Sequence, residues 1–169
     1  MENDGYILAN DLYPHKAKLI KKNAEGYGAG IIHTSCFDAS EYDESLSESF
    51  DYIICDVPCS GLGIIRKKPD IRFKSPDELE ALTDIQKNIL NTACRYLKKG
   101  GRMLYSTCTI LPSENEDQVN DFLNAHPDFR LVPFNLNGRA EAGEKTFLPH
   151  RDGTDGFFIA LLERRPQPC

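Results

Sequence analysis

Apolar runs and amphipathic stretches alternate along the chain. Short runs rich in β-branched and aromatic residues predict strands, and longer stretches with apolar residues at helical spacing predict helices. The predicted strands are residues 5–11, 30–36, 50–57, 102–109, 129–134 and 156–165. The predicted helices are residues 14–28, 75–101 and 112–127. This alternation favours an α/β fold with a mostly parallel sheet. No helix separates the last two strands, so we allow one of them to run antiparallel.

The helix over 75–101 has clear boundary signals. Ser75 is expected to be its N-cap, and Glu78 to complete a capping box. The Gly100–Gly101 pair is expected to end it, because glycine stops helices readily. The helix after the next strand is expected to be capped by Ser113.

The run "FDYIICDV" at 50–57 is typical of a strand buried on both faces. A turn stiffened by Pro58 follows it, because proline fixes its own φ and favours an extended residue before it. Cys55 lies inside the apolar run and is assigned to the core. Cys59 lies outside it, beside Asp56, where a positioned thiol can act as a nucleophile or base.

Chemically capable residues follow four predicted strands. Asp11 ends the first strand, Asp38 follows the second, Asp56 and Cys59 follow the third, and Cys108 follows the fourth. In open α/β sheets ligands bind outside the carboxyl ends of the strands, so we expect these residues along one edge. Asp11 is suited to bind ribose hydroxyls or to cap the helix that follows. Asp38 alone would be interpreted as a structural loop or cap residue.

Cys59 and Cys108 are expected to face each other across a pocket. Backbone N–H groups and the next helix can lower the pKa of a thiol at the position of Cys108. A redox pair is one alternative, although such pairs are usually a local C-x-x-C. A Cys–His hydrolase is another, but no histidine has a clear claim. Zinc is not expected, because no paired C-x2-C sets accompany His33-x-x-Cys36.

Charge is unevenly distributed. The 169 residues carry a net charge of −6, which argues against a nucleic-acid binder unless basic residues cluster locally. Residues 66–74 hold five basic residues and one acid, a net charge of +4. We interpret this segment as a phosphate-facing loop; a solvated loop is the alternative. No apolar run approaches a membrane span, and the N-terminus has no signal-peptide pattern, so a cytoplasmic location is expected.

Four motifs resemble the NOL1/NOP2/Sun family of RNA cytosine-5 methyltransferases. "FDYIICDVPCSG" and "YSTCTILPSENEDQV" are similar to its two cysteine motifs. "IIRKKPDIRF" resembles the bacterial Sun/Fmu branch, which acts on small-subunit ribosomal RNA, and "FLPHRDGTDGFFIALLER" resembles its C-terminal strand motif. The resemblance implies a Rossmann-like class I methyltransferase fold. It also implies RNA contacts by Arg66, Lys67, Lys68 and Arg72.

The resemblance implies a role for each site residue. Cys108 would attack C6 of a cytosine, so that C5 can take the methyl group of S-adenosylmethionine. Cys59 would help to eliminate the enzyme. Asp56 would hydrogen-bond the base near N3 and lie beside the cofactor. Asp11 would bind the cofactor ribose, and Asp38 would lie near the adenine.

Two parts of the family's pattern have no counterpart in the chain. The glycine-rich loop resembling "D-x-C-A-A-P-G-G-K" and the N-terminal RNA-binding region are both missing. We therefore expect residues 1–169 to be part of a catalytic domain with an incomplete S-adenosylmethionine site, inactive alone. The sheet would lack its first strand, and self-association could fill the gap. A transfer-RNA cytosine-5 methyltransferase and a non-catalytic RNA-binding or assembly module remain alternatives.

Overall fold

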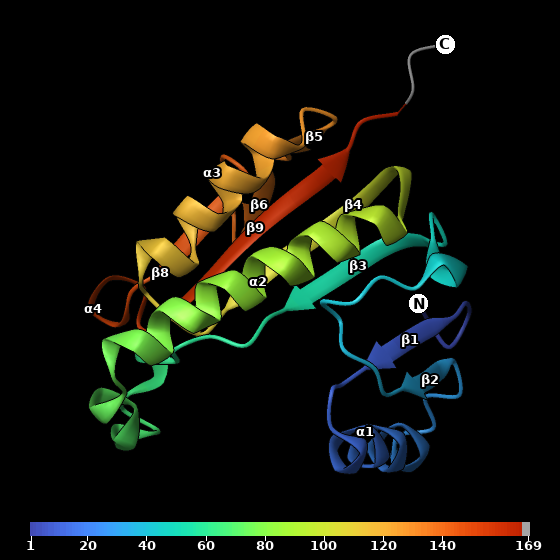
Figure 1. Ribbon diagram of the computed structural model, residues 1–169, viewed down its shortest axis with the longest axis horizontal. Coiled ribbons are helices and arrows are strands. Elements are labelled where there is room, and N and C mark those ends of the chain that lie inside the picture. Colours follow the sequence, from blue (N-terminus) through green and yellow to red (C-terminus); the bar gives the residue numbers. More distant parts are fainter. Residues whose placement is uncertain (167–169) are drawn as a thin grey trace. The chain divides into compact units, whose positions relative to one another are not determined.

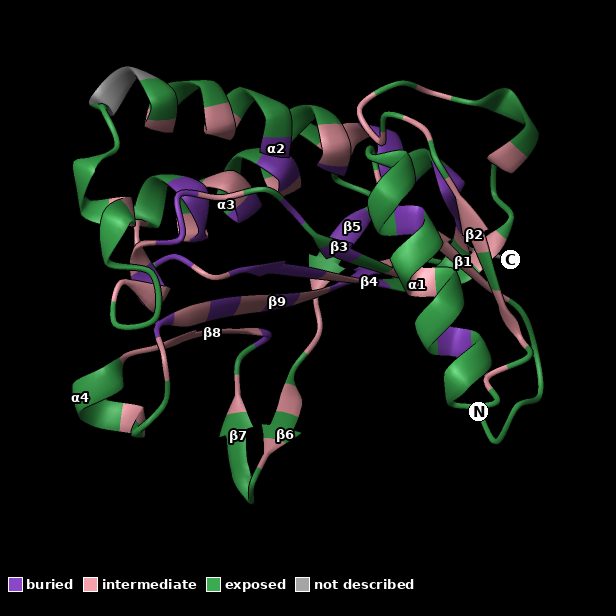
Figure 2. Ribbon diagram, turned by 90° about the horizontal axis from the view of Figure 1, so that it is seen from below, coloured by how far each residue is buried: buried purple, intermediate pink, exposed green. Residues whose placement is uncertain are grey.

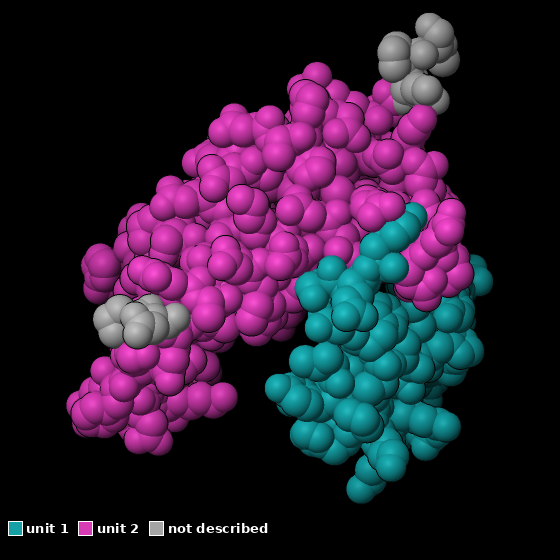
Figure 3. All heavy atoms as spheres, viewed as in Figure 1, with its two compact units in different colours: residues 1–42 teal, residues 43–169 magenta. Residues whose placement is uncertain are grey.

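The computed structural model describes residues 1–166, and for residues 76 and 77 only the course of the backbone. The chain forms two compact units, residues 1–42 and the part from residue 43 on (Figure 3). Each unit has its own sheet, so each is described by itself.

The first unit is a single βαβ crossover. Its elements are strand β1, helix α1 and strand β2, at Ile7–Asn10, Pro14–Gly26 and Ile32–Ser35. The two strands are parallel and in register from Ile7 opposite Ile32 to Asn10 opposite Ser35. The Asn10 carboxamide joins the strand ends, because its oxygen accepts hydrogen bonds from the Phe37 N–H and the Ser35 hydroxyl, both at 3.1 Å. Proline at the first position of α1 fits the sequence prediction.

The second unit holds the larger sheet and the longest helix, α2 (Figure 1). Its strands are β3 (Phe50–Asp56), β4 (Leu97–Thr107), β5 (Phe129–Leu131), β6 (Phe134–Leu136), β7 (Arg139–Glu141), β8 (Glu144–Phe147) and β9 (Phe157–Arg164). Its α-helices are α2 (Pro76–Tyr96), α3 (Glu116–Ala125) and α4 (Pro149–Asp152). Its 3-10 helices are η1 (Glu44–Leu46), η2 (Leu62–Ile64), η3 (Pro69–Phe73) and η4 (Pro112–Glu114).

The sheet of the second unit is mixed. Strand β3 runs parallel to β4, with α2 as the crossover between them. Strand β9 is antiparallel to β4, β5 and β8. The expectation that one of the last two predicted strands runs antiparallel is therefore confirmed by β9. The parallel β3–β4 pair matters most for function, because its two carboxyl ends lie next to each other.

The hydrophobic core lies between this sheet and two helices. Figure 2 shows α2 and α3 on the same side of the sheet, with the β6–β7 hairpin on the other side. Most core side chains come from α2, β4, α3 and β9, with Cys55 from β3 and Phe129 from β5; they include Leu90, Ala93, Met103, Tyr105, Val119, Phe122, Phe158 and Leu162. The rings of Tyr105 and Phe158 meet edge to face at 6.2 Å between centroids, a favourable aromatic geometry. This core fixes β4 and β9 beneath the site.

The prediction that 50–57 is buried on both faces is wrong. Tyr52 and Ile54 are 75% and 73% exposed, whereas Cys55 is 6% exposed. Strand β3 lies at one end of the strand order, and only β4 pairs with it among residues 1–166. The apolar run therefore predicts more burial than β3 has, because only the face of the strand turned to α2 is covered.

The boundaries of α2 were predicted correctly at one end only. Ser75 and Glu78 form the expected capping box, with the Glu78 N–H bonded to the Ser75 hydroxyl and the Ser75 N–H to the Glu78 carboxylate. The helix ends at Tyr96, not at Gly101. Leu97 is fully buried and already pairs with Phe50. Tertiary burial therefore ends the helix four residues before the glycine pair.

One further prediction from the second half of the chain is wrong, and some short strands were not predicted. Ser113 lies in η4 and does not cap α3, whose N-cap residue is Asn115. The single strand predicted over 129–134 is divided into β5 and the first residue of β6. Strands β7 and β8 were missed, because each has only three or four residues and shows no clear alternation. Within residues 1–166, no helix is both long and apolar enough to cross a lipid bilayer.

Candidate active site

The two cysteines singled out from the sequence meet at the ends of β3 and β4. These strands are parallel, with Asp56 opposite Ser106, so the loops that follow them leave the sheet side by side. The Sγ atoms of Cys59 and Cys108 are 3.2 Å apart. The N–H of Cys108 also donates to the Cys59 sulfur at 3.3 Å. Both thiols are half-buried and free, so the expected juxtaposition of the two thiols is present.

The contact between the thiols makes them chemically different. Its hydrogen bond with Cys59 lowers the pKa of Cys108 to about 7, with a smaller contribution from the charge of Lys68. Burial and the charge of Asp56 act against this shift. The same hydrogen bond, followed by burial, raises the pKa of Cys59 above its ordinary range. At neutral pH the shared proton therefore stays on Cys59, and much of Cys108 is a thiolate. A thiolate is the reactive form of a cysteine nucleophile.

Cys55 shows the contrast between a core thiol and a site thiol. Burial raises the pKa of Cys55 to about 12, and its side chain belongs to the hydrophobic core. Its assignment to the core is confirmed.

Asp56 is the last residue of β3 and is exposed. Its Oδ1 accepts a hydrogen bond from the Ser106 hydroxyl at 3.1 Å, across the parallel strand pair. This bond orients the carboxylate at the same strand ends that carry the two thiols. A carboxylate and a thiolate are thereby presented together.

A buried polar network lies beneath the two thiol loops. The Glu114 side chain is fully buried, and its Oε2 accepts hydrogen bonds from the Ser60 N–H and from the Gln86 Nε2, each at 2.8 Å. Gln86 Nε2 also donates to the Pro58 carbonyl at 2.9 Å. The hydroxyls of Ser60 and Thr109 are 2.7 Å apart. The residues on both sides of Cys59 are thus held to α2 and to the loop of Cys108.

Sequence reasoning missed Glu114 and Gln86. Gln86 lies four residues from Leu82 and Leu90 on the apolar stripe of α2. A polar residue on the buried face of a helix needs a buried partner, and this was a usable signal. Glu114 had no local signal, because its partners lie 28 and 54 residues away.

Two glycines bring a third segment to the site. The Gly63 N–H donates to the Cys108 carbonyl at 3.0 Å, and the Gly156 N–H donates to the Gly63 carbonyl at 2.9 Å. A Cβ atom at Gly63 would lie 2.0 Å from the Gly156 oxygen. The backbones therefore touch directly, which joins the loop after Cys59 to the segment before β9.

The basic segment is attached to the Cys59 turn. The Lys74 ammonium donates to the Ser60 carbonyl at 2.9 Å, and the Ile71 side chain packs where a Cβ of Gly61 would stand. Arg66 and Lys67 form ion pairs with Asp155, which offsets part of their charge. The segment lies beside the thiols, as a phosphate-facing loop requires. Some of its basic side chains are already bound to other groups of the protein.

Asp11 and Asp38 lie in the first unit, after the adjacent ends of β1 and β2. Asp11 accepts a hydrogen bond from the Tyr13 N–H at 2.9 Å and pairs with Lys16 at 3.9 Å. Asp11 therefore bonds to the residue before α1, but it does not cap the helix, because the N-cap residue is Tyr13 and no side chain caps it. Asp38 accepts from the hydroxyl and N–H of Ser40 at 2.7 and 2.9 Å, and these hydrogen bonds lower its pKa. Both carboxyls remain capable of accepting further hydrogen bonds.

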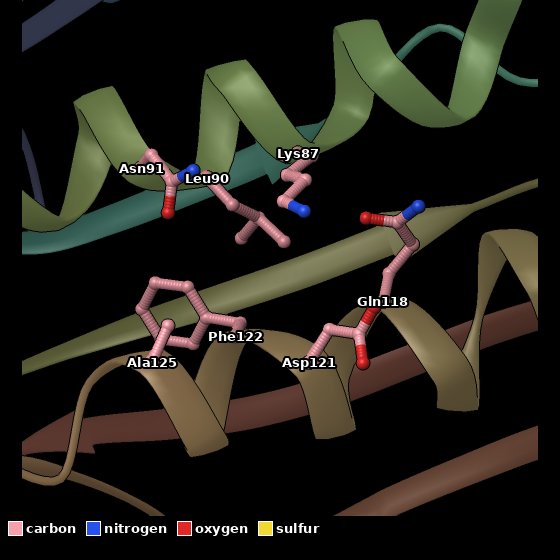
Figure 4. Close-up of a pocket in the computed structure, with 7 residues that line it drawn as sticks. All are labelled: Lys87, Leu90, Asn91, Gln118, Asp121, Phe122 and Ala125. Atoms are coloured by element: carbon pink, nitrogen blue, oxygen red, sulfur yellow. The ribbon is translucent and has the colours of Figure 1, made fainter.

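A separate pocket lies between α2 and α3, as Figure 4 shows. It is lined by Lys87, Leu90, Asn91, Gln118, Asp121, Phe122 and Ala125. These residues belong to the two helices, and none comes from the thiol loops. Leu90 and Phe122 are core residues, so the pocket is a dent between packed helices.

Comparison with known proteins identifies the family. The sequence profile described as 16S rRNA methyltransferase RsmB/F matches residues 1–163. The chain belongs to this family. This chain is 40% identical to a probable ribosomal RNA small subunit methyltransferase B of Bacillus subtilis, over 98% of its own length and 39% of the relative. It therefore spans about two fifths of that curated relative.

Solved structures resemble this chain closely in fold. The protein PH0851 superposes with a TM-score of 0.89 at 37% identity, over 96% of this chain and 38% of that one. NSun6 from Pyrococcus horikoshii, solved with SFG, gives a TM-score of 0.79 at 27% identity, over 96% and 42%. The predicted Rossmann-like α/β methyltransferase fold and the resemblance drawn from the cysteine motifs are confirmed.

Proposed function

We propose that this chain carries the cytosine-binding part of an S-adenosylmethionine-dependent methyltransferase that modifies C5 of a cytosine in 16S ribosomal RNA. The observation that carries the proposal is the thiol pair. Cys108 has a pKa lowered to about 7 and Cys59 a raised one, at 3.2 Å between sulfurs. The family and the name of the Bacillus subtilis relative support the ribosomal RNA substrate.

In this proposal the Cys108 thiolate attacks C6 of a cytosine. The new S–C6 bond moves the electrons of the C5–C6 double bond to C5, which becomes nucleophilic. Asp56 hydrogen-bonds the base near N3, where charge develops. A base must leave its stack to reach such a site. Bound S-adenosylmethionine would supply the electrophilic methyl group.

Cys59 is suited to the release step. Its pKa is raised mainly by its hydrogen bond to Cys108, and that influence ends once the Cys108 sulfur is bonded to carbon. Cys59 can then lose its proton to solvent and take the proton from C5. The C5–C6 double bond forms again, the S–C6 bond breaks, and Cys108 leaves as a thiolate. One contact thus supports both the attack and the release.

The residues present fit part of a cofactor site. Asp11 and Asp38 place carboxyl oxygens after neighbouring parallel strands, where ribose and adenine groups bind in such folds. Asp11 would hold the ribose and Asp38 would lie near the adenine. SFG, which accompanies the NSun6 structure, is an analogue of S-adenosylmethionine and supports this cofactor. Lys68 and Arg72 would face RNA phosphates, together with Arg66 and Lys67.

The test uses a chimera, in which these 169 residues replace the matching segment of the Bacillus subtilis relative. The chimera should transfer labelled methyl groups to 16S ribosomal RNA transcripts. Cys108→Ala should abolish methylation and any covalent RNA adduct. Cys59→Ala should let an adduct accumulate on a denaturing gel, because release is blocked.

Cys36→Ala is the matched control, because this exposed thiol bonds only weakly, to the Leu12 carbonyl at 3.5 Å. It should leave both readouts unchanged. An adduct that accumulates with Cys108→Ala would reverse the two assignments. Methylation of transfer RNA in place of ribosomal RNA would show that transfer RNA is the substrate. No methylation of either RNA would favour a non-catalytic module.

A further inference from the structure

Phe73 is a large apolar side chain left in solvent beside the thiol loops. It ends η3, and its side chain is 75% exposed. Single exposed aromatics are common and by themselves need no explanation. This one lies within the basic segment 66–74, which has a net charge of +4. Its surroundings therefore combine an open ring with positive charge.

The position of η3 is fixed relative to the proposed active site. Lys74, next to Phe73, donates to the Ser60 carbonyl at 2.9 Å. Ile71, two residues before it, packs against the Gly61 backbone. The charge of Lys68, just ahead of η3, acts on Cys108. Phe73 is thus carried by a short helix that is attached directly to the Cys59 turn.

The ring of Phe73 is covered on one side only. The Arg72 guanidinium lies over it at 5.0 Å from the centroid, which is a cation–π distance. Because the ring is still 75% exposed, its other face is open to a ligand. Arg72 thus limits the ring's orientations and adds a positive charge beside it.

The basic side chains of the segment 66–74 differ in the groups that they contact. Arg66 and Lys67 form ion pairs with Asp155, and Lys74 donates to a backbone carbonyl. Arg72 supplies the positive charge at the ring itself, and Lys68 adds a second charge just before η3. Proteins that bind single-stranded nucleic acid use this combination, in which cations follow the backbone and aromatic rings stack on unpaired bases.

We propose that Phe73 stacks on an unpaired nucleobase of the RNA next to the target nucleotide, while Lys68 and Arg72 contact the adjoining phosphates. This inference rests on the proposed function and names a further RNA-binding residue of the same site. A flipped target base leaves its neighbours without a stacking partner, and an open aromatic ring beside the thiols supplies one. Stacking tolerates any base, so Phe73 adds affinity rather than sequence specificity.

The experiment uses the absence of tryptophan from the whole sequence. Phe73→Trp places a single indole at the proposed stacking position. Titration with a single-stranded cytosine-containing oligoribonucleotide should quench its fluorescence strongly, because stacked bases quench indole emission. The matched control is Tyr27→Trp, at a side chain that is 89% exposed in the first unit. Its emission should stay constant over the same titration.

A second series measures affinity by the anisotropy of a labelled oligoribonucleotide. Phe73→Ala should weaken binding by about tenfold to hundredfold, the range for loss of one stacked base. Phe73→Tyr should bind like the unchanged chain, and Phe73→Leu should resemble Phe73→Ala, because leucine is apolar but cannot stack. Lys68→Ala with Arg72→Ala should weaken binding and reduce its salt dependence, while quenching at saturation persists.

Three results would overturn the inference. The first is binding to Phe73→Trp without quenching. The second is equal quenching by an oligomer whose ribose–phosphate backbone carries no bases. The third is the absence of any RNA binding by the chain. None of these decides whether Cys108 forms an adduct in the chimera, so the two proposals fail separately.

Discussion

At the scale of single residues, one contact gives two cysteines opposite properties. Cys59 and Cys108 follow parallel strands and lie at similar depth. Their pKa values nevertheless move in opposite directions, because one proton is shared across 3.2 Å. The contact couples the two thiols, and their surroundings decide which one keeps the proton, because burial also raises the pKa of Cys59 and the charge of Lys68 helps to lower that of Cys108.

Alkylation of Cys108 should reveal this sharing. The rate of its reaction with iodoacetamide should rise with pH and level off above an inflection near 7, because only the thiolate reacts. Cys59→Ala removes the main cause of the shift and should move the inflection up toward the ordinary value of 9.0. Peptide mass spectrometry gives the rate at each pH, and Cys36→Ala is the control. An unchanged inflection in Cys59→Ala would show that other groups set the pKa.

Glu114 should matter for stability as well as for the site. Glu114→Ala leaves the Ser60 N–H and one N–H of the Gln86 amide without their buried acceptor, and each unpaired buried group costs about 1–3 kcal/mol. We expect the free energy of unfolding in urea to fall by roughly 3 kcal/mol. Glu114→Gln keeps the shape and one acceptor oxygen, so it should lose less.

Glu80→Ala, at an exposed position of α2, is the control for that measurement. It should change the free energy of unfolding by no more than about 0.5 kcal/mol. Equal losses in Glu80→Ala and Glu114→Ala would contradict the structural role given to the buried network.

At the scale of elements, the site depends on segments that touch through their backbones. The loop after Cys59, the loop of Cys108 and the segment before β9 meet at Gly63 and Gly156. Hydrogen bonds at 2.9 and 3.0 Å join the three. A side chain at this point would have to force two loops apart.

Gly63→Ala should therefore be poorly tolerated. Its Cβ would stand 2.0 Å from the Gly156 oxygen and 2.8 Å from the Cys108 oxygen. We expect the unfolding free energy, measured by calorimetry, to drop by roughly 3 kcal/mol, as for severe overpacking. Gly30→Ala has no atom within 4 Å of the new Cβ and should be close to neutral. Similar losses at both glycines would show that the close contact is not the cause.

The sequence predicted the local parts of this arrangement well. The predicted strand ends gave the positions of Asp56, Cys59 and Cys108 correctly, because the loops that follow parallel strands lie at one edge of the sheet. The capping box at Ser75 was also a local pattern. The end of α2 and the burial of β3 were predicted wrongly, since both depend on what packs against them. The role of Glu114 depends on partners far along the chain, which no window of sequence contains.

At the scale of the whole molecule, the apolar core is confined to one of the two units. Its buried members run from Cys55 to Leu162, and none lies in residues 1–42. In the first unit the buried apolar side chains are Ala17 and Ala24, as far as the described residues go. A single βαβ crossover with so little buried surface is marginal on its own.

Hydrogen exchange should separate the two units. Backbone amides of β1 and β2 should exchange well before those of β4 and β9, because local opening needs less energy where few apolar groups are buried. Peptide-resolved mass spectrometry measures both in one sample. Residues 43–169, produced alone, should keep the slow exchange of β4 and β9. Equal protection of both units would show that they unfold as one.

The contact between Gly63 and Gly156 has a consequence for related sequences. The two positions lie 93 residues apart, yet each limits the other, because their backbones leave no room for a methyl group. A variant that replaces either glycine must move a loop and with it the carbonyl of Cys108. In a library of functional variants, both positions should therefore stay glycine even where their neighbours vary freely. The pair is a spatial signature that can be searched for without any reference to the cysteines.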